Sequence, residues 1–225
     1  MTISTPSISR LLVTMKIEII GVCAQSEGEQ ILLTLKITDD EGVMTQKRKL
    51  LIFTDKYIEL GLRRGDLIDR DTFDILEDAA RTCRAIQKGS DLLSYSSASK
   101  AGLVKKLRMR GFDREIAQQA ADFLESAHFI DEQGDVQRAV DSYLKKLWGR
   151  KRIYCELVKK GYDKNDVAET VESVEFEQFV ENCATLIRKK VREVPRDPVE
   201  RKKLVAFLSR YGYSFSEIRE AFDKI

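Results

Sequence analysis

One pattern of about fifty residues occurs three times in this chain, and it constrains the fold more than any other feature. Two apolar residues four positions apart precede a glycine by eight and four positions, and an aromatic residue and an oxygen-bearing side chain follow the glycine. The copies run over 103–113, 153–163 and 204–214, and their glycines are 50 and 51 residues apart. A helix that ends at a left-handed glycine, followed by a capped helix, has this pattern. The sequence therefore predicts three tandem helical units that stack on one another.

Capping signals within these copies predict where individual helices begin. Ser99 can cap the helix that carries the first copy. Asp197 can cap a helix that has Pro198 at its first position and Glu200 at its third. Ser214 with Glu217 has the spacing of a capping box. Each unit is therefore predicted to contain a longer first helix, a middle helix that ends at the glycine, and a short third helix.

Ahead of the repeats, the apolar pattern has period two rather than the helical period. Alternation runs through residues 15–19 and 33–37, and a third segment ends at 50–53; Ser26–Glu29 and Asp39–Gly42 lie between them as turns. Such alternation predicts a small antiparallel sheet with one packed face, with a bulge near Gly21 and a helical turn at 60–66 closing the unit. Three strands are marginally stable alone, so we expect the sheet to pack on the helix that follows.

The predicted fold is mainly α: three tandem three-helix repeats in an elongated array, preceded by a small antiparallel β domain, and α+β overall. The expected divisions are a flexible tail over 1–14, the β domain over 15–70, and repeats over 71–130, 131–174 and 175–225.

Composition and cysteine placement exclude several classes of protein. The net charge is +2, so no global field attracts nucleic acid or membrane. No apolar run approaches the roughly 18 residues of a membrane span. The four cysteines are scattered, and three lie in apolar helical patterns and one in a strand, which predicts buried thiols in a reducing compartment. We therefore expect a cytoplasmic protein with no membrane partner.

Residues for catalysis or metal binding are scarce. His128 is the only histidine, and we expect it at a helix end or in a loop. Triads with spare imidazoles and Cys/His zinc clusters are thereby excluded, and no glycine-rich phosphate loop is present. The chain is predicted not to be an enzyme and to need no cofactor or metal.

Charge is segregated along the repeats. Net charges of +5, +6 and +5 over 100–114, 145–164 and 182–203 alternate with two blocks of −6. Basic helices can simply pair with acidic neighbours, or three equivalent blocks can form a stripe that binds phosphate or an acidic protein groove; both readings stay open. Only Trp148 and Tyr154 interrupt the clusters, so base stacking has weak support. The candidate binding residues are Lys105, Lys106, Arg108, Arg110, Arg150, Lys151, Arg152, Lys159, Lys160, Arg201, Lys202 and Lys203.

The repeats resemble the RecX family of bacterial regulators of the RecA recombinase. The resemblance covers roughly residues 73–225, and the third copy is divergent. It is carried by Ser99 with the first copy of the pattern, by Phe129-Ile130-Asp131-Glu132, and by the second copy from Gly149 to Tyr162. The segment 60–66 followed by Phe73 also resembles the N-terminal extension of longer members.

The resemblance implies a non-enzymatic regulator of homologous recombination and the SOS response. Its expected partners are the groove of the RecA–single-stranded DNA filament and DNA itself, single- or double-stranded, and its expected effect is inhibition of RecA ATPase, strand exchange and co-protease activities. We expect a monomer. Two alternatives stay open: a general nucleic-acid-binding repeat protein, which would bind naked DNA and filaments equally, and a protein-binding scaffold, whose filament binding would not depend on salt.

Overall fold

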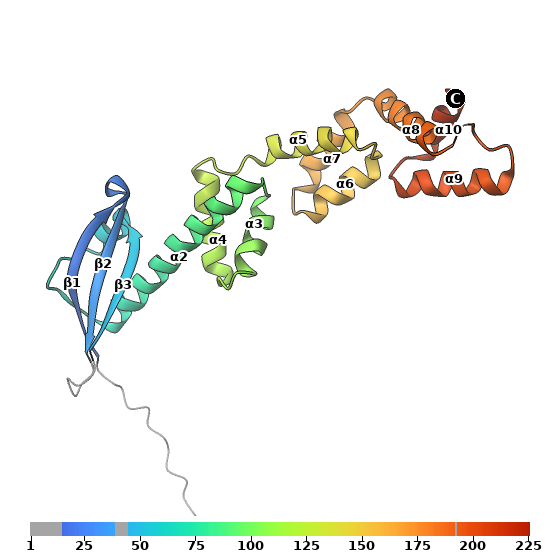
Figure 1. Ribbon diagram of the computed structural model, residues 1–225. Helices are drawn as coiled ribbons and strands as arrows, with labels where there is room; N and C mark the ends of the chain where they lie inside the picture. Colours follow the sequence, from blue (N-terminus) through green and yellow to red (C-terminus); the bar gives the residue numbers. More distant parts are fainter. Residues whose placement is uncertain (1–14, 39–44, 192) are drawn as a thin grey trace, which may run out of the picture. The chain divides into compact units, whose positions relative to one another are not determined.

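A computed structural model describes residues 15–38, 45–191 and 193–225 (Figure 1). The expected tail 1–14, the expected turn Asp39–Gly42 and Arg192 of the third basic block lie outside these residues. The chain divides into two compact units, of which the first ends at Gln87 and the second begins at Lys88.

The first unit contains the predicted antiparallel sheet. Its strands are β1 (Lys16–Gln25), β2 (Gln30–Thr38), β3 (Thr45–Phe53) and β4 (Leu67–Ile68), in the order β3-β2-β1-β4. Alternate residues of β2, from Ile31 to Leu35, are buried and face the core. The two-residue strand β4 was not predicted; it pairs Ile68 with Ile17 of β1.

The predicted bulge is present in β1. The register with β2 shifts between Ile19 and Gly21. Ile17 and Ile19 before the bulge are buried, and after it the partly buried Val22 packs against the same core. A Cβ on Gly21 would lie 3.3 Å from the Thr34 side chain, so the glycine suits the close approach of β2. The turn before β2 contains a short 3-10 segment, Ser26–Gly28.

Helix α2 (Arg70–Tyr95) covers one face of this sheet, as predicted. Its buried residues Phe73, Leu76 and Ala80 join the strand residues in one core. The short helix that we expected at 60–66 lies earlier, as α1 (Thr54–Glu59), and 60–66 form a loop with positive φ at Gly61 and Gly65. The boundary between the units falls inside α2 rather than at residue 70, because the first half of α2 packs on the sheet.

The second unit has the predicted helical order, and the first helix of each repeat is the longest, as predicted. The expected short third helix is found only in the last repeat: in the first repeat the third helix has 13 residues against 9 in the middle helix, and in the second both have 10. Each middle helix is followed by a glycine with positive φ: +89° at Gly111, +92° at Gly161 and +97° at Gly212. Beyond α2, the helices are α3 (Lys100–Arg108), α4 (Arg114–Ser126), α5 (Glu132–Lys145), α6 (Arg150–Lys159), α7 (Lys164–Ser173), α8 (Phe176–Lys190), α9 (Pro198–Arg210) and α10 (Phe215–Asp223).

The predicted caps at Ser99, Asp197 and Ser214 are confirmed, and Asp163 of the second copy caps α7, whereas Asp113 of the first copy makes no side-chain capping hydrogen bond to α4. Ser99 caps α3 by accepting a hydrogen bond from the Gly102 amide, and Asp197 caps α9. Ser214 and Glu217 form a complete capping box at the start of α10. These side chains satisfy amides that a helix leaves unpaired in its first turn.

Successive middle helices meet end to end. The carbonyls of Tyr211 and Gly212, after α9, accept hydrogen bonds from the amides of Gly149 and Lys151 at the start of α6, at 2.8 and 3.0 Å. The end of α6 meets the start of α3 similarly, since the Ser99 hydroxyl donates to the Lys160 carbonyl at 2.8 Å. The negative end of one helix dipole thus lies against the positive end of the next, which is favourable.

The expectation of buried thiols is wrong for two of the four cysteines. Cys83 and Cys183 are buried, whereas Cys23 and Cys155 are exposed, and all four are free. Cys155 lies in α6 between the buried residues Ile153 and Leu157, so its side chain falls on the outer face of that helix. None of the described helices has the length and apolar character needed to cross a membrane.

Candidate functional site

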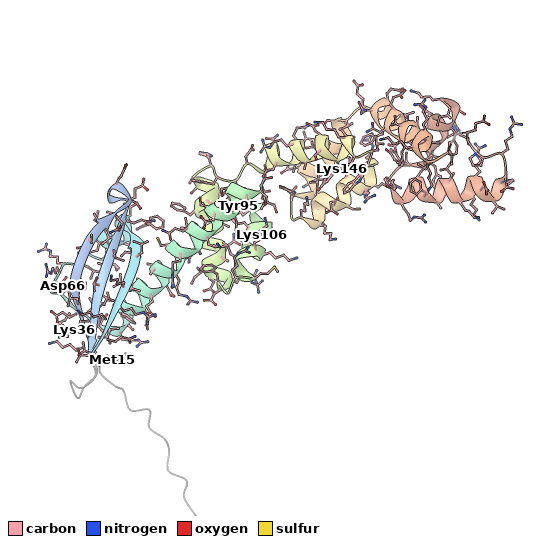
Figure 2. The ribbon with its side chains drawn as sticks, viewed as in Figure 1. Met15, Lys36, Asp66, Tyr95, Lys106 and Lys146 are labelled. Carbon is pink, nitrogen blue, oxygen red and sulfur yellow. The ribbon has the colours of Figure 1, made fainter. Side chains whose placement is uncertain are left out.

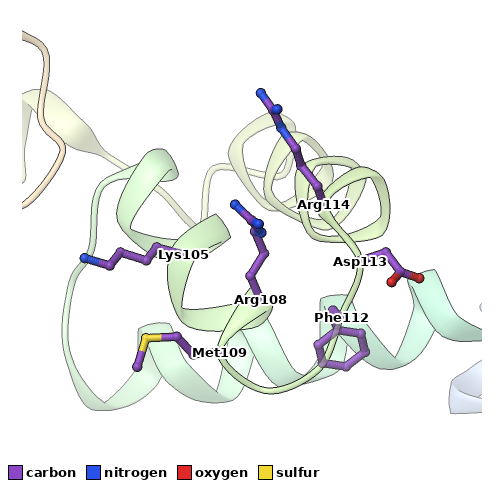
Figure 3. A pocket seen from close by; sticks show the side chains of 6 residues that line it. All are labelled: Lys105, Arg108, Met109, Phe112, Asp113 and Arg114. Carbon is purple, nitrogen blue, oxygen red and sulfur yellow. The ribbon is translucent and has the colours of Figure 1, made fainter.

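The basic residues of α3 border an open hollow on the first repeat. Figure 3 shows this hollow, of about 470 Å³, with Arg108 and Arg114 pointing to the same side of it. Lys105 borders it from one turn earlier in α3, and Met109, Phe112 and Asp113 complete the lining. Arg110, which was also a candidate, donates from Nη1 to the Lys106 carbonyl at 3.0 Å. The hollow can bind an anionic group beside an apolar one.

A cation stands three residues before the first buried leucine or isoleucine of every middle helix, and in each repeat it packs on the third helix. Lys100 contacts Asp122 and Glu125 of α4, at 2.7 and 2.6 Å. Hydrogen bonds to these two carboxylates raise the pKa of Lys100 above its ordinary value. The position therefore has an intramolecular role in the first repeat.

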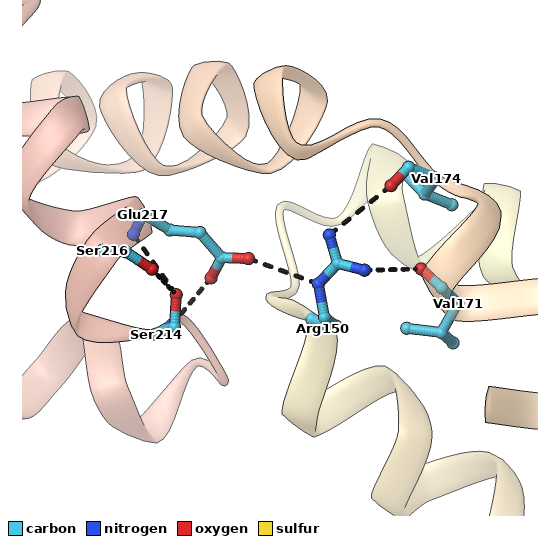
Figure 4. A network of polar contacts seen from close by, with 6 residues as sticks. All are labelled: Arg150, Val171, Val174, Ser214, Ser216 and Glu217. Atoms are coloured by element: carbon cyan, nitrogen blue, oxygen red, sulfur yellow. Dashed lines mark hydrogen bonds and ion pairs between the residues drawn. The ribbon is translucent and has the colours of Figure 1, made fainter. Parts of the chain in front are cut away.

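Arg150 occupies this position in the second repeat, and its guanidinium is engaged within the protein (Figure 4). It donates to the carbonyls of Val171 and Val174 at 3.0 and 3.5 Å and lies 3.4 Å from the buried carboxylate of Glu217. Its other contact is the ring of Phe179, 4.4 Å from Cζ. Arg150 therefore connects the second repeat to the third.

Arg201 is the equivalent residue of the third repeat. Its Cζ lies 4.9 Å from the centre of the Phe222 ring on α10. Arg150 and Arg201 were candidates for binding a partner, and the structure places both against the third helix of their own repeat.

Arg152 has a different environment, in a column of stacked side chains. Tyr143 of α5 stacks on Trp148, with centroids 4.4 Å apart and ring planes at 10°. The Cζ of Arg152 lies 4.0 Å from the Trp148 centroid and 5.0 Å from that of Tyr211. Because Tyr143 covers one face of Trp148, Arg152 must cover the other. We call these four residues, Tyr143, Trp148, Arg152 and Tyr211, the cationic column.

Two lysines flank the cationic column. Lys160 donates from Nζ to the hydroxyl of Tyr143 at 2.6 Å. The Nζ of Lys146 lies 5.4 Å from the Tyr143 centroid and 5.9 Å from that of Trp148. The column and its two lysines thus bring three cations together beside a pair of rings.

Lys160 also borders a cleft between the first and second repeats. This cleft, of about 300 Å³, has Lys106 of α3 on another side and the serines Ser96 and Ser97 in its lining. Figure 2 labels Lys106 on α3 and Lys146 after α5. Lys160 therefore contacts the cationic column on one side and shares a cleft with Lys106 of the first repeat on the other. The column itself includes Tyr211 of the third repeat.

The remaining candidates are exposed cations. Lys151 borders a hollow between α6 and α7, and Lys190 of the third basic block lies 4.1 Å from the centre of the Phe207 ring. The other exposed candidates are Lys159, Lys202 and Lys203.

His128 lies at a helix end, as predicted, with φ of +59° directly after α4. Within the part of the chain that the structure describes, no group of three or more His, Cys, Asp or Glu residues could hold a metal ion.

Sequence reasoning missed Arg114, Lys146 and the rings of Tyr143 and Tyr211. Arg114 lies in the first basic block, so a search for cations beside helix-ending glycines would have found it. Tyr211 approaches Arg152 only because the end of α9 meets the start of α6, and no local pattern in the sequence carries that contact.

The fold and the surface together define the class of protein: a tandem three-helix-repeat protein with an N-terminal antiparallel sheet and a cation-rich second unit. Residues 177–222 match a family model described as RecX, third three-helix domain. A regulatory protein RecX of Clostridium botulinum (strain Alaska E43 / Type E3) is 26% identical over 202 residues, which cover 82% of this chain and 93% of that protein. One from Chlorobaculum tepidum is 28% identical over 145 residues, or 64% of this chain and 89% of the relative.

Two crystal structures have the same fold. One, of a regulatory protein RecX, superposes with a TM-score of 0.71 at 21% identity and covers 92% of this chain and 99% of its own. The other, RecX from Lactobacillus salivarius, gives a TM-score of 0.58 at 21% identity over 65% of this chain and 99% of its own. The chain is therefore similar to regulatory proteins RecX in sequence over most of its length, and it shares their fold.

Proposed function

We propose that this protein regulates a RecA-type recombinase by binding the filament that the recombinase forms on single-stranded DNA. The observation that carries the proposal is the match to regulatory proteins RecX, which extends over 82% of the chain. RecA regulation is the role that the resemblance to this family implies.

The surface chemistry supports a polymeric, anionic partner. The hollow on the first repeat has three cations on its border, and the cationic column adds three more, Arg152 within it and Lys146 and Lys160 beside it. A filament on DNA repeats both its protein surface and its phosphates along one axis. A protein built of similar units can therefore make similar contacts at successive positions of that partner.

The proposal includes the consequences of such binding for the recombinase. A repeat protein seated in the filament groove bridges neighbouring subunits, and it limits the subunit movements that accompany ATP hydrolysis and strand exchange. It also blocks access for a protein that the filament would otherwise help to cleave. In this role the protein acts as a monomer in the cytoplasm and by binding alone, without a reaction of its own.

The test is a titration of RecA's DNA-dependent ATPase with this protein at two salt concentrations. We expect the ATPase rate to fall as the protein is added, with weaker inhibition at the higher salt because phosphate contacts release counterions. An unchanged ATPase rate at saturating protein, at both salt concentrations, would contradict the proposal.

Charge reversal on the first repeat gives a second arm. Lys105→Glu with Arg108→Glu changes two exposed side chains of the hollow, so the variant should fold and should inhibit the ATPase less. The matched control is Arg219→Glu with Glu220→Lys on α10, which exchanges two exposed charges and leaves the hollow intact. Equal inhibition by both variants would remove the hollow from the proposal.

A further inference from the structure

The outer edge of strand β3 has no partner strand among the residues that the structure describes. The sheet order is β3-β2-β1-β4, so β3 ends the sheet on one side (Figure 1). On the other side, β4 covers part of β1 by pairing with Ile17 and Glu18. β3 runs for nine residues, Thr45–Phe53, and its inner side pairs with β2 over that whole length. An edge of this length can accept an added strand.

One hydrogen bond shows which backbone groups of β3 point outward. The Thr54 amide, directly after β3, donates to the Glu29 carbonyl at 3.0 Å, in the register of the β2–β3 pair. The backbone groups of an antiparallel strand point alternately to its two sides, so the even-numbered residues of β3 direct theirs to β2. The odd-numbered residues from 45 to 51 therefore direct their N–H and C=O groups outward, and these are Thr45, Lys47, Lys49 and Leu51.

The side chains of these outward-pointing residues lie on the open face of the sheet. Leu50 and Ile52 are buried in the core that α2 covers, and side chains of a strand alternate between its faces. Lys47 and Lys49 therefore lie on the face opposite α2. Both are exposed, and neither has an ion pair within 4.0 Å among the described residues. Arg48, on the core side, is instead 2.6 Å from a carboxylate of α2.

The cross-strand neighbours of Lys47 define which charge the next strand should carry. Glu18 of β1 is opposite Lys36 of β2, and Lys36 is opposite Lys47. Across the sheet, this row therefore has an acid followed by two bases. Opposite charges directly across two strands stabilise a sheet, and like charges destabilise it. A carboxylate is therefore the side chain favoured at the position beyond Lys47.

Charge and backbone chemistry also decide between possible occupants of this edge. A second copy paired antiparallel about the middle of β3 would set lysines opposite lysines, which is unfavourable. Residues 1–14 of this chain contain one arginine and no acidic residue, so they supply no complementary charge. A nucleic acid would match the two lysines but has no N–H donors at strand spacing for the outward carbonyls of β3. The edge therefore favours an acidic segment of another protein.

We propose that the outer edge of β3 binds an extended segment of a partner protein that carries acidic residues at alternate positions. The segment adds antiparallel to β3, and its backbone pairs with the outward groups of that strand. Its acidic side chains lie beside Lys47 and Lys49 on the open face. The residues between the acids lie on the core face, beside Leu50 and Ile52, where apolar side chains are favoured. This goes beyond the proposed function, which uses no surface of the first unit.

The test measures binding of a fluorescently labelled peptide to the full chain by anisotropy. The acidic probe is an acetylated peptide that alternates Glu with Val, and the basic probe has Lys in place of each Glu. We expect Lys47→Glu with Lys49→Glu to weaken binding of the acidic probe at least about tenfold and to strengthen binding of the basic probe, because two cross-strand pairs change sign. This edge variant should fold, since both side chains are exposed and Lys36 lies opposite position 47; circular dichroism checks this.

Two controls separate strand addition from general attraction between charges. Lys202→Glu with Lys203→Glu makes the same change of charge at two exposed positions of α9 and should leave binding of the acidic probe within about twofold. The second control is backbone methylation of the acidic probe. In an antiparallel pair, the residues opposite Lys47 and Lys49 direct their own N–H groups toward β3. Methylation of the Glu amides should therefore abolish binding, whereas methylation of the Val amides should leave it within about twofold.

Three results would each overturn the proposal: no binding of the acidic probe, equal losses in the edge variant and the α9 control, or full binding after methylation of the Glu amides. An edge variant that loses affinity for an oligothymidylate but keeps the acidic probe would assign the lysines to nucleic acid and would also overturn it. So would a dimer of the unaltered protein, seen by sedimentation, that the edge variant abolishes. Because no recombinase is present in any arm, failure here leaves the regulatory function standing.

Discussion

A cation at one fixed position of each repeat has a different partner in every unit. Lys100 pairs with two exposed carboxylates, Arg150 binds two carbonyls and a buried carboxylate, and Arg201 lies on a ring. Exposed pairs contribute little to stability, whereas removal of one member of a buried pair leaves the other charge without compensation. Equivalent residues should therefore differ widely in their contribution to folding.

Replacement of this cation in two repeats tests that difference. Arg150→Met leaves Glu217 buried without its cation and should lower the free energy of unfolding by about 3 kcal/mol. Arg201→Met loses only contact with the Phe222 ring, worth about 0.5–1 kcal/mol. Urea denaturation followed by circular dichroism measures both, and equal losses would contradict the structural role given to Arg150.

Thiol reactivity is a second prediction at the residue scale. Burial raises the pKa of Cys183 to about 12 and also raises the pKa of Cys83. Since the thiolate is the reactive form, these thiols should stay unmodified at pH 8 while Cys23 and Cys155 react. A colorimetric disulfide reagent should therefore titrate two thiols in the native protein and four in denaturant, and Cys155→Ser should reduce the native count to one. Four fast thiols in the native state would show that the cores are open.

At the scale of elements, the glycines that end the middle helices have one backbone conformation and two kinds of surroundings. A Cβ on Gly111 would meet nothing within 4 Å, whereas one on Gly212 would lie 2.4 Å from the amide nitrogen of Arg152. The first glycine is needed only for its positive φ, and the second is also needed for the joint between α9 and α6.

Asparagine at the two positions separates these requirements, because asparagine tolerates positive φ better than other side chains. We expect Gly111→Asn to lower the free energy of unfolding by about 1 kcal/mol. Gly212→Asn should cost about 1–3 kcal/mol more, because the joint must move apart. Thermal unfolding of both variants measures the difference, and equal costs would contradict the close approach at the joint.

The helical elements could be predicted from the sequence because their signals are local. The glycine pattern, the Ser99 and Ser214 caps and the period-two alternation each act within a few residues, and the structure confirms all of them. The strand β4 was missed because two residues carry no periodicity. The cationic column was missed because Tyr211 meets Arg152 across two repeats, at a separation of 59 residues.

At the scale of the whole molecule, the local distribution of charge determines binding to an anionic partner more than the net charge does. The net charge is only +2 although the helical unit has strongly basic blocks, because acidic blocks of the same repeats offset their charge. Lys100, whose block is basic, is neutralised by Asp122 and Glu125, while the cations of the column keep no acidic partner among the described residues. Salt should therefore weaken binding to a filament although the protein as a whole is nearly neutral.

The most direct test of the regulatory account compares affinities for two forms of one DNA. Labelled protein is titrated with single-stranded DNA, and then with the same DNA carrying a preassembled RecA filament, at one salt concentration. The account predicts tighter binding to the filament, because protein surface adds to the phosphate contacts. Equal affinity for both forms would contradict it and would instead indicate a general nucleic-acid-binding protein.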